Sequence, residues 1–393
     1  MTNVSIIGAG NSGLTMAAHL SSAGNDVSLW NRSRNTISDL AETKCIHCHG
    51  MIEQDVTINM VSSDIGEVVS GADIILVTTP ADSHQEVAHL LKPYLSEESC
   101  VVLNPGRTFG AVEFQTTLQR EGCTGLPLIA EAQTIMYVCR KTDPVSANLL
   151  AFKKDVLISA IHPKDTRTVI TRLPKCIRSH FIPARSMIQT SIGNVGMILH
   201  CAPVLFNTGW IENPKTAFKY YHEGISPTIA GFLEKLDQER LQISHLMGEK
   251  IESITEWLKR SYDLEGDNLY QCIQNNKAYE TIDAPTTLQH RYLFEDLSVG
   301  LVPVEAVGKR LGLPMKSMGL VIDFASSMLN VNFRETGRNL KRLGMDDKSG
   351  LEIKKILGSR REPPQFLPGI DHRSRIRKIT GDRRGSPMMP LVA

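Results

Sequence analysis

Three glycines near the N-terminus constrain the fold more than any other feature of this sequence. Gly8, Gly10 and Gly13 follow the apolar stretch NVSII and open the helix-like segment NSGLTMAAHLSSAG. A G-x-G-x-x-G pattern between a strand and a helix is typical of a dinucleotide-binding turn. Gly8 would permit the tight turn, Gly10 would let the backbone approach a pyrophosphate, and Gly13 would let helix and strand pack closely. The N–H groups at the start of the helix, around Asn11 and Ser12, would bind the anion.

The first half of the chain alternates strand-like and helix-like segments. This alternation predicts an α/β fold with a doubly wound, mostly parallel sheet, a Rossmann-type domain that we assign to residues 1–185. Two strands end at Thr79 and Pro80 and at Asn104 and Gly106, on the side where a parallel sheet binds ligands. We therefore expect these residues near the nicotinamide and its ribose, although turn chemistry alone also explains them. The strand-like stretches are NVSII, DVSLWN, ADIILVTTP, CVVLNPG, LPLIAEAQT and DVLISAI.

The end of the second strand indicates the type of dinucleotide. An NAD-selective site usually has Asp or Glu at this point to bind the ribose 2′-hydroxyl. This chain has Asn31, Arg32, Ser33 and Arg34, with no carboxylate and with two guanidinium groups suited to a 2′-phosphate. The stretch therefore predicts NADP as the preferred cofactor, with NAD as the second option, and assigns Asn31, Arg32 and Arg34 to the cofactor site. Two solvated surface arginines are the alternative interpretation.

Composition and charge argue against several classes of protein. The 393 residues carry a formal net charge of +1, which predicts no nucleic-acid partner. The chain begins MTNVSIIGAG, without the basic and apolar regions of a signal peptide, and has no uninterrupted apolar run of about 18 residues. We therefore expect a cytoplasmic protein with reduced thiols and no membrane partner.

The stretch ETKCIHCHGMI has the C-x-x-C-H spacing of c-type haem attachment. Residues 45–60 alternate with period two and predict a strand pair, so Cys45 and Cys48 would point to opposite faces of a strand. His47 and His49 would share a face with Cys45, but a zinc site there lacks a convincing fourth ligand. We therefore predict neither haem nor a metal.

The pattern becomes mainly helical from Ser186 onward. In SPTIAGFLEKLDQERLQISHLMG, Ser226 suits a helix N-cap and Pro227 the first helical position. An apolar stripe follows, made of Ile229, Phe232, Leu233, Leu236, Ile243 and Leu246. We assign residues 186–358 to a second, all-helical domain. Residues 359–393 are rich in Arg, Pro and Gly and are interpreted as a basic, flexible tail.

Several long stretches carry a resemblance to a known family. They are GAGNSG, LNPGRTFGAVEF and AEAQTIMYVCR in the first half, and GNVGMILHCAPVLFNTG, YYHEGISPTIAGFLEKLDQER, KAYETIDAP and HRYLFEDLSVGLVP in the second. From the N-terminal glycines to about Gly344, the chain resembles the octopine/nopaline-type opine dehydrogenases. The resemblance implies an NAD(P)H-dependent reductive condensation of an α-keto acid with the amino group of an amino acid, in the cleft between the two domains.

The resemblance also implies roles for individual residues. His200 corresponds to the catalytic histidine, Asp296 to its carboxylate partner and Arg291 to the clamp for a substrate carboxylate. A histidine suits a proton donor that works near neutral pH, and a carboxylate behind it fixes its tautomer. Asn194 and Tyr221 are further candidates for substrate binding, although packing explains Tyr221 equally well. The residue pattern alone does not single out His200, because a lone histidine on an apolar helix face is more often a core residue.

Two other functions stay open at this point. One is a related two-domain keto-acid reductase with a ketopantoate-like or glycerol-phosphate-like substrate; such families use a catalytic lysine, and we find none in a comparable position. The other is an NADP-binding regulatory protein without turnover, which would be expected to lack part of the set His200, Arg291 and Asp296. The sequence leaves open which amino acid and keto acid react, the product stereochemistry, the physiological direction, the role of the tail, and whether the protein is a monomer or a homodimer.

Overall fold

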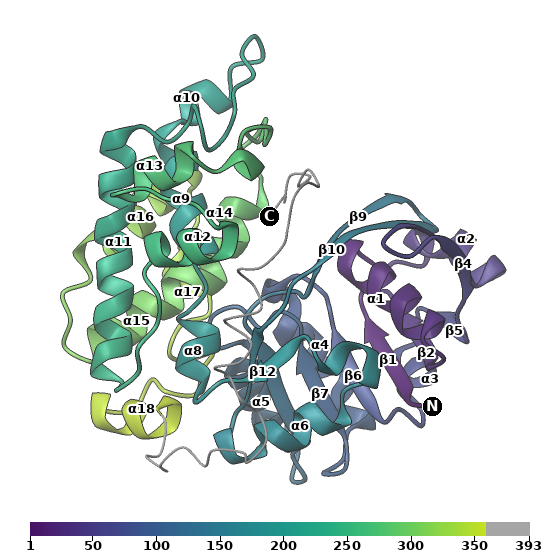
Figure 1. The fold of residues 1–393 in the computed structure, drawn as a ribbon. Helices are drawn as coiled ribbons and strands as arrows, with labels where there is room; N and C mark the ends of the chain where they lie inside the picture. Colours follow the sequence, from purple (N-terminus) through teal and green to yellow (C-terminus); the bar gives the residue numbers. More distant parts are fainter. Residues whose placement is uncertain (359–393) are drawn as a thin grey trace, which may run out of the picture.

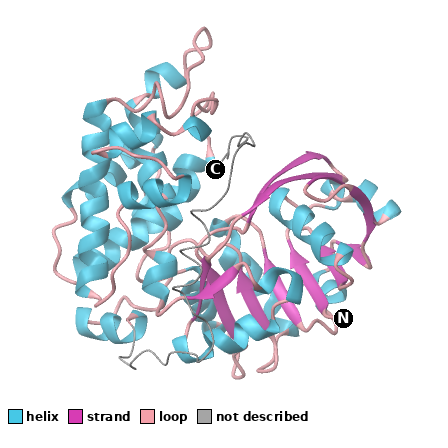
Figure 2. Ribbon diagram, viewed as in Figure 1, coloured by secondary structure: helices cyan, strands magenta, loops and turns pink. Residues whose placement is uncertain are grey.

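The computed structural model describes residues 1–358, so the predicted basic tail at 359–393 lies outside the described residues. Figure 1 shows two bodies, one built around a β-sheet from the first half of the chain and one built of helices from the second half. Figure 2 shows the strands in the first of these bodies. The dinucleotide-binding signal and the mainly helical pattern of the sequence therefore lie in different bodies.

The main sheet has eight strands in the order β12-β11-β8-β7-β6-β1-β2-β5. Neighbouring strands are parallel except where β11 meets β8. The strand order reverses between β1 and β6, which in open α/β sheets is the point where a dinucleotide binds. The strands are β1(Asn3–Ile7), β2(Asp26–Trp30), β5(Met60–Ser62), β6(Ile74–Val77), β7(Cys100–Leu103), β8(Leu128–Ala132), β11(Val156–Ala160) and β12(Phe181–Pro183).

Alternate residues of the central strands enter two separate cores, one on each face of the sheet. On β7, Val101 and Leu103 enter one core and Cys100 and Val102 the other. The first core continues into the helical body, so that body packs on one face of the sheet. The helices of the first body are α1(Asn11–Ser22), α2(Ser38–Thr43), α3(Ile65–Val69), α4(His84–Leu91), α5(Gly110–Arg120), α6(Thr166–Arg172) and α7(Lys175–Arg178).

A second sheet of four strands lies against α1. Its order is β4-β3-β10-β9, with β3 parallel to β10 and the other two pairs antiparallel. The strand pair predicted over residues 45–60 is confirmed as β3 and β4, whereas β9 and β10 were not predicted from the sequence. These strands are β3(Cys45–Gly50), β4(Gln54–Thr57), β9(Tyr137–Asp143) and β10(Ser146–Phe152).

The long helix predicted after Ser226 is confirmed. The Ser226 hydroxyl accepts a hydrogen bond from the backbone N–H of Ile229 at 3.3 Å, and Pro227 is the first helical residue. Of the predicted stripe, Leu236 is fully buried and Leu246 is exposed at the end of the helix. The helices of the second body are α8(Met187–Ser191), α9(Gly196–Phe206), α10(Thr208–Ile211), α11(Pro227–Leu246), α12(Ile254–Tyr262), α13(Leu269–Gln274), α14(Arg291–Asp296), α15(Val302–Arg310), α16(Lys316–Leu329), α17(Phe333–Thr336) and α18(Gly350–Leu357).

The segment that contains α8 and α9 is the most apolar of the second body. By length and composition Met187–Phe206 could cross a membrane, but 78% of its most apolar window is buried inside the protein. Buried core helices have this composition as well. Helix α9 therefore serves as the central helix of the second body, and it carries His200 into that core.

A buried ion pair joins the two bodies beside the main sheet. Arg338 Nε donates to Glu113 Oε2 at 2.7 Å, and neither side chain is exposed. The same guanidinium donates to the carbonyl oxygens of Thr108 and Ala81, each at 2.8 Å. Because Thr108 follows β7 and Ala81 follows β6, this arginine of the second body holds the ends of two central strands in place.

Candidate active site

The glycine turn has the shape that the sequence predicts. Gly8 has φ of +113°, and a Cβ there would lie 2.9 Å from Thr79 Cγ2. A Cβ on Gly13 would lie 1.7 Å from the carbonyl oxygen of Gly8, so close packing of α1 on the turn requires glycine there. A Cβ on Gly10 would meet nothing within 4 Å. Gly10 therefore leaves open the approach to the start of α1 that a pyrophosphate needs.

Two strand-end residues carry buried polar atoms without a partner. In the described part of the chain, Thr79 Oγ1 and Asn104 Oδ1 are buried and form no hydrogen bond. Such atoms are rare in folded proteins, and the polar groups of a bound dinucleotide would satisfy them. Pro80 is exposed beside Thr79. Gly106 is a packing position, because a Cβ there would lie 2.3 Å from the Cβ of Glu131.

Asn11, the first residue of α1, is hydrogen-bonded to β9 of the second sheet. Asn11 Oδ1 accepts a hydrogen bond from the backbone N–H of Lys141 at 3.0 Å, and Lys141 Nζ donates to the carbonyl oxygen of Ala9 at 3.3 Å. Ser12 is half-buried beside it. The side chain of Asn11 therefore positions the turn, and Lys141 on β9 adds a cation beside the turn that the sequence did not point to.

The three residues predicted to select the cofactor have different surroundings. Asn31 Oδ1 accepts a hydrogen bond from the backbone N–H of Ala9 at 3.2 Å and so supports the glycine turn. Arg32 forms an exposed ion pair with Glu86 at 2.7 Å. Arg34 begins a short 3-10 turn and, within residues 1–358, forms no ion pair. Arg34 is therefore the guanidinium better able to take a 2′-phosphate.

His200 and Asp296 form a buried pair at the centre of the second body. His200 Nδ1 lies 2.8 Å from Asp296 Oδ2, and the two residues are 6% and 1% exposed. The other ring nitrogen, Nε2, lies 3.2 Å from the Tyr221 hydroxyl. Tyr292 stacks on the imidazole with ring centres 3.8 Å apart. The ring is therefore held at both nitrogens and on one face.

Arg107 reaches this pair from the first body. Its Nη1 lies 3.4 Å from Asp296 Oδ1, and its Nε donates to Glu295 Oε1 at 3.3 Å. Burial raises the pKa of the Asp296 carboxyl, but Arg107 and then His200 outweigh burial, so the pKa of Asp296 is lowered. Burial likewise opposes the charge on Arg107, yet Asp296 and Glu295 raise its pKa. Asp296 is therefore a carboxylate at neutral pH.

The predicted substrate residues lie around the pair in different settings. The Arg291 side chain is 59% exposed and its Nη2 lies 2.7 Å from Glu295 Oε2. Asn194 Oδ1 accepts from the backbone N–H of Gly196 at 3.0 Å, while its Nδ2 is buried and has no partner among the described residues. Burial raises the pKa of Tyr221 well above its usual value, so its hydroxyl stays neutral.

Sequence reasoning missed three residues of this site. Arg107 lies in the quoted stretch LNPGRTFGAVEF and Tyr292 in HRYLFEDLSVGLVP, but no spacing marks either as a functional residue. Lys153 follows β10, a strand that was not predicted, and burial is the main cause that lowers its pKa to about 8. The family-like stretches were the only available signal for the first two, and Lys153 had none.

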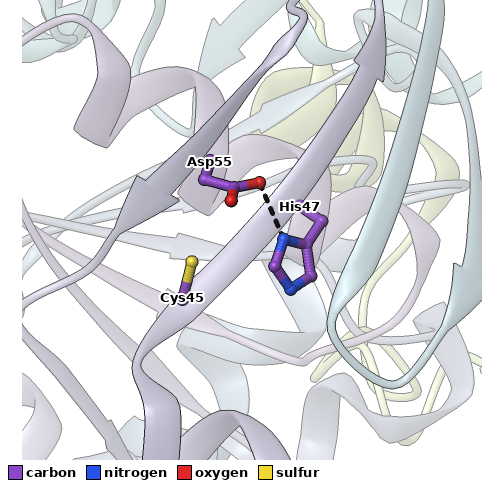
Figure 3. Close-up of side chains that lie close together, drawn as sticks. All are labelled: Cys45, His47 and Asp55. Atoms are coloured by element: carbon purple, nitrogen blue, oxygen red, sulfur yellow. Dashed lines mark hydrogen bonds and ion pairs between the residues drawn. The ribbon is translucent and has the colours of Figure 1, made fainter.

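The C-x-x-C-H stretch forms part of the second sheet. Burial is the main cause that raises the pKa of Cys48 to about 11, and Cys45 lies on the opposite, more exposed face. Figure 3 shows His47, Cys45 and Asp55 together, with His47 Nδ1 2.7 Å from Asp55 Oδ1. Their ligand atoms lie within 4.8 Å of one another. Asp55, from the neighbouring strand, is a third residue with a ligand atom in this cluster, and the sequence did not reveal it. The contact between His47 and Asp55 is an ordinary His–Asp pair.

The two bodies and the groups between them define a two-domain NAD(P)-dependent dehydrogenase. Residues 183–329 match the family described as NAD/NADP octopine/nopaline dehydrogenase, alpha-helical domain, and residues 3–106 match the N-terminus of NAD-dependent glycerol-3-phosphate dehydrogenase. An opine dehydrogenase of Arthrobacter sp. (strain 1C) is 31% identical over 89% of this chain and 97% of its own length. The chain belongs to the opine dehydrogenase family, NAD(P)-dependent oxidoreductases that act on CH–NH groups, and the resemblance stated from the sequence is confirmed.

Solved structures agree with this fold. An octopine dehydrogenase in complex with NADH and agmatine has a TM-score of 0.75 at 18% identity, covering 93% of this chain and all of the other. A yersinopine dehydrogenase with NADP⁺ bound has a TM-score of 0.69 at 16% identity, covering 91% of this chain and 97% of the other. The predicted combination of a Rossmann-type sheet and a helical second domain is therefore confirmed.

Proposed function

We propose that the protein condenses an α-keto acid with the amino group of an amino acid, with NADPH preferred over NADH, to give an N-(carboxyalkyl) amino acid. The observation that carries this proposal is the buried contact of 2.8 Å between His200 Nδ1 and Asp296 Oδ2. It gives a chain of this family a histidine whose Nδ1 is bound to a carboxylate, so Nε2, which lies 3.2 Å from the Tyr221 hydroxyl, is the nitrogen that we assign to acid–base work.

The glycine turn with Asn11 and Ser12 would hold the pyrophosphate, and Arg34, with Arg32 and Asn31 beside it, the 2′-phosphate. Thr79 and Asn104 would bind polar groups near the nicotinamide ring, which supplies the hydride to the substrate carbon. The open approach at Gly10 and the unpartnered oxygens of Thr79 and Asn104 support this fit. Pro80 and Gly106 lie beside Thr79 and Asn104 at the ends of β6 and β7.

Proton transfer is assigned to His200. The keto acid and the amine lose water to form an imine, and reduction of the imine adds one hydride to carbon and one proton to nitrogen. Protonated His200 gives that proton from Nε2, and Tyr221 faces the same atom. Asp296 accepts the Nδ1–H bond and stabilises the imidazolium while it exists. Arg291 is assigned to a substrate carboxylate, which a planar guanidinium can bind through two hydrogen bonds.

The test is to follow oxidation of NADPH and NADH with pyruvate, glyoxylate or α-ketoglutarate against a panel of amino acids. Opine formation requires both substrates. It yields a secondary amine whose mass is that of the imine plus two hydrogen atoms. Oxidation by a keto acid alone, unaffected by any amine, would support the keto-acid reductase alternative. A protein that binds NADPH without any turnover would support the regulatory alternative.

A further inference from the structure

Each of the two substrates in the proposed reaction carries a carboxylate, and the site contains more than one cation. Arg291 is mostly exposed, whereas the Arg107 side chain is only 16% exposed. The Nε of Arg107 donates a hydrogen bond to Glu295, and its Nη1 faces Asp296. Within residues 1–358, Nη2 makes no hydrogen bond, so the outer edge of this buried guanidinium is available to a further acceptor.

The surroundings of Gly196 show that Arg107, Asn194 and His200 lie close together. A Cβ on Gly196 would be 3.1 Å from Arg107 Nη1, 3.3 Å from Asn194 Oδ1 and 3.6 Å from His200 Cε1. Arg107, from the loop after β7, therefore lies against Asn194 and His200, which belong to one continuous segment around the start of α9. Asn194 is nine-tenths buried, and its Nδ2 has no partner among the described residues, so it is a donor without an acceptor. A buried amide N–H of this kind is costly unless something accepts from it.

Hydrogen bonds of the neighbouring residues Gln133 and Thr134 connect a second cation, Lys153, to the segment that contains Asn194. Lys153 Nζ donates to Thr134 Oγ1 at 3.3 Å and forms no ion pair within the described part of the chain. Next to Thr134, Gln133 Nε2 donates to the carbonyl oxygen of Gly193, which precedes Asn194. Burial and the charge of Arg107 together lower the pKa of Lys153. A half-buried ammonium that is repelled by another cation is unfavourable alone, and an anion between the two would relieve the repulsion.

On the basis of the proposed function, we propose that Arg107, Asn194 and Lys153 form the subsite for the carboxylate of the α-keto acid. Arg107 and Asn194 donate hydrogen bonds to it, and Lys153 supplies the charge that balances it. With His200 protonated, as the proposed proton transfer requires, the charges of Arg107, Arg291, His200, Glu295 and Asp296 sum to one positive charge. Lys153 adds a second, so the site balances the two carboxylates of the two substrates. Arg291 is then left for the carboxylate of the amino acid.

The position of Arg107 favours the keto acid over the amino acid. Arg107 follows Asn104 and Gly106 in the loop after β7, which is the strand end assigned to the nicotinamide. The carbon that accepts hydride is bonded directly to the keto-acid carboxylate. An anchor beside both the nicotinamide and His200 therefore holds the reacting carbon between the hydride donor and the proton donor.

The test measures binding of oxamate, a non-reducible analogue of pyruvate, to the protein–NADPH complex by calorimetry. The variants are Lys153→Met, Asn194→Asp and Arg107→Lys, with Arg260→Lys as the control because Arg260 forms an exposed pair with Glu252. Asn194→Asp keeps the acceptor for Gly196 but replaces the free donor by a negative oxygen. Thermal unfolding is recorded for each variant. Lys153→Met removes a half-buried charge that has no ion-pair partner among the described residues, so this variant breaks no ion pair.

We expect each of the three variants to raise the Kd of oxamate at least tenfold, with the Kd of NADPH changed less than threefold and the control unchanged. The proposal is overturned if Lys153→Met and Asn194→Asp bind oxamate like the wild type, or if the wild type does not bind it. It is also overturned if these variants raise the KM of the amino acid instead of the keto acid. Tight oxamate binding with the expected pattern but no opine product would refute the proposed function and leave the subsite standing.

Discussion

The phenol ring of Tyr292 stacks on the imidazole ring of His200, with ring centres 3.8 Å and planes 12° apart. Tyr292 and Asp296 belong to the same helix, α14, so one short element sets both the plane of the imidazole and the partner of its Nδ1. A π-helical turn over Leu297–Leu301 directly follows Asp296. Such turns often occur at functional sites. The imidazole of His200, the proposed proton donor, is therefore oriented in the absence of substrate.

Replacing Tyr292 tests this orientation. We expect Tyr292→Leu to lower kcat by roughly 2- to 13-fold, because loss of an aromatic contact of about 0.5–1.5 kcal/mol frees the ring to tilt. Tyr292→Phe keeps the stack and should retain kcat within about threefold of the wild type. Steady-state kinetics with saturating NADPH measure both variants. Equal losses in the two would mean that the hydroxyl, and not the stacked ring, supports His200.

The carboxylate behind the histidine gives the second prediction. Asp296→Asn keeps the shape but removes the charge that fixes the tautomer of His200, so kcat should fall about 10²- to 10⁴-fold. Asp283→Asn is the matched control, because Asp283 forms an exposed pair with Lys219. NADPH titration by fluorescence should show unchanged cofactor affinity in both variants. Turnover of Asp296→Asn near the wild-type rate would remove the dyad from the mechanism.

The third prediction concerns the arginines after β2, to which we assign cofactor selectivity. We expect Arg34→Ala to raise the KM of NADPH at least tenfold, the effect of losing a charge-assisted hydrogen bond worth about 1.5–3 kcal/mol, with the KM of NADH nearly unchanged. Arg32→Ala should have the smaller effect, because Arg32 already pairs with Glu86. The two cofactors are compared at a fixed keto acid and amino acid. A wild-type enzyme that prefers NADH tenfold would contradict the arginine argument.

Lys153 should make stability depend on pH in a defined direction. Its pKa is about 8 in the folded protein, below the ordinary value of 10.5. Between these values the unfolded chain binds more protons, so the contribution of Lys153 to stability rises with pH and is least favourable below pH 8. Lys153→Met should therefore unfold at higher urea concentration than the wild type at pH 7, and the difference should shrink toward pH 10.5. A variant that is less stable at pH 7 would contradict this assignment.

Local patterns in the sequence were sufficient for the glycine turn and for the helix after Ser226. Each depends on a few neighbouring residues: Gly13 meets Gly8 within one turn, and Ser226 caps a helix that begins at Pro227. The parallel sheet also follows from local runs of apolar residues. These features could be predicted because their physical causes lie within short segments.

Contacts between distant segments could not be predicted in this way. Arg107 meets Glu295 across 188 positions, and only the docking of the two bodies brings them together. Asp55 lies beside His47 because β3 and β4 pair in one particular register, which the sequence alternation did not specify. The roles of His200 and Asp296 came from the family resemblance, since an apolar helix with one histidine has no signal of its own.

The most direct measurement compares His200→Ala with the wild type in NADPH-dependent condensation of a keto acid with an amino acid. We predict that kcat/KM falls about 10²- to 10⁴-fold, the usual contribution of a general acid, while the Kd of NADPH and the thermal unfolding temperature stay close to those of the wild type. A folded His200→Ala enzyme that forms the opine at the wild-type rate would show that His200 is not the proton donor.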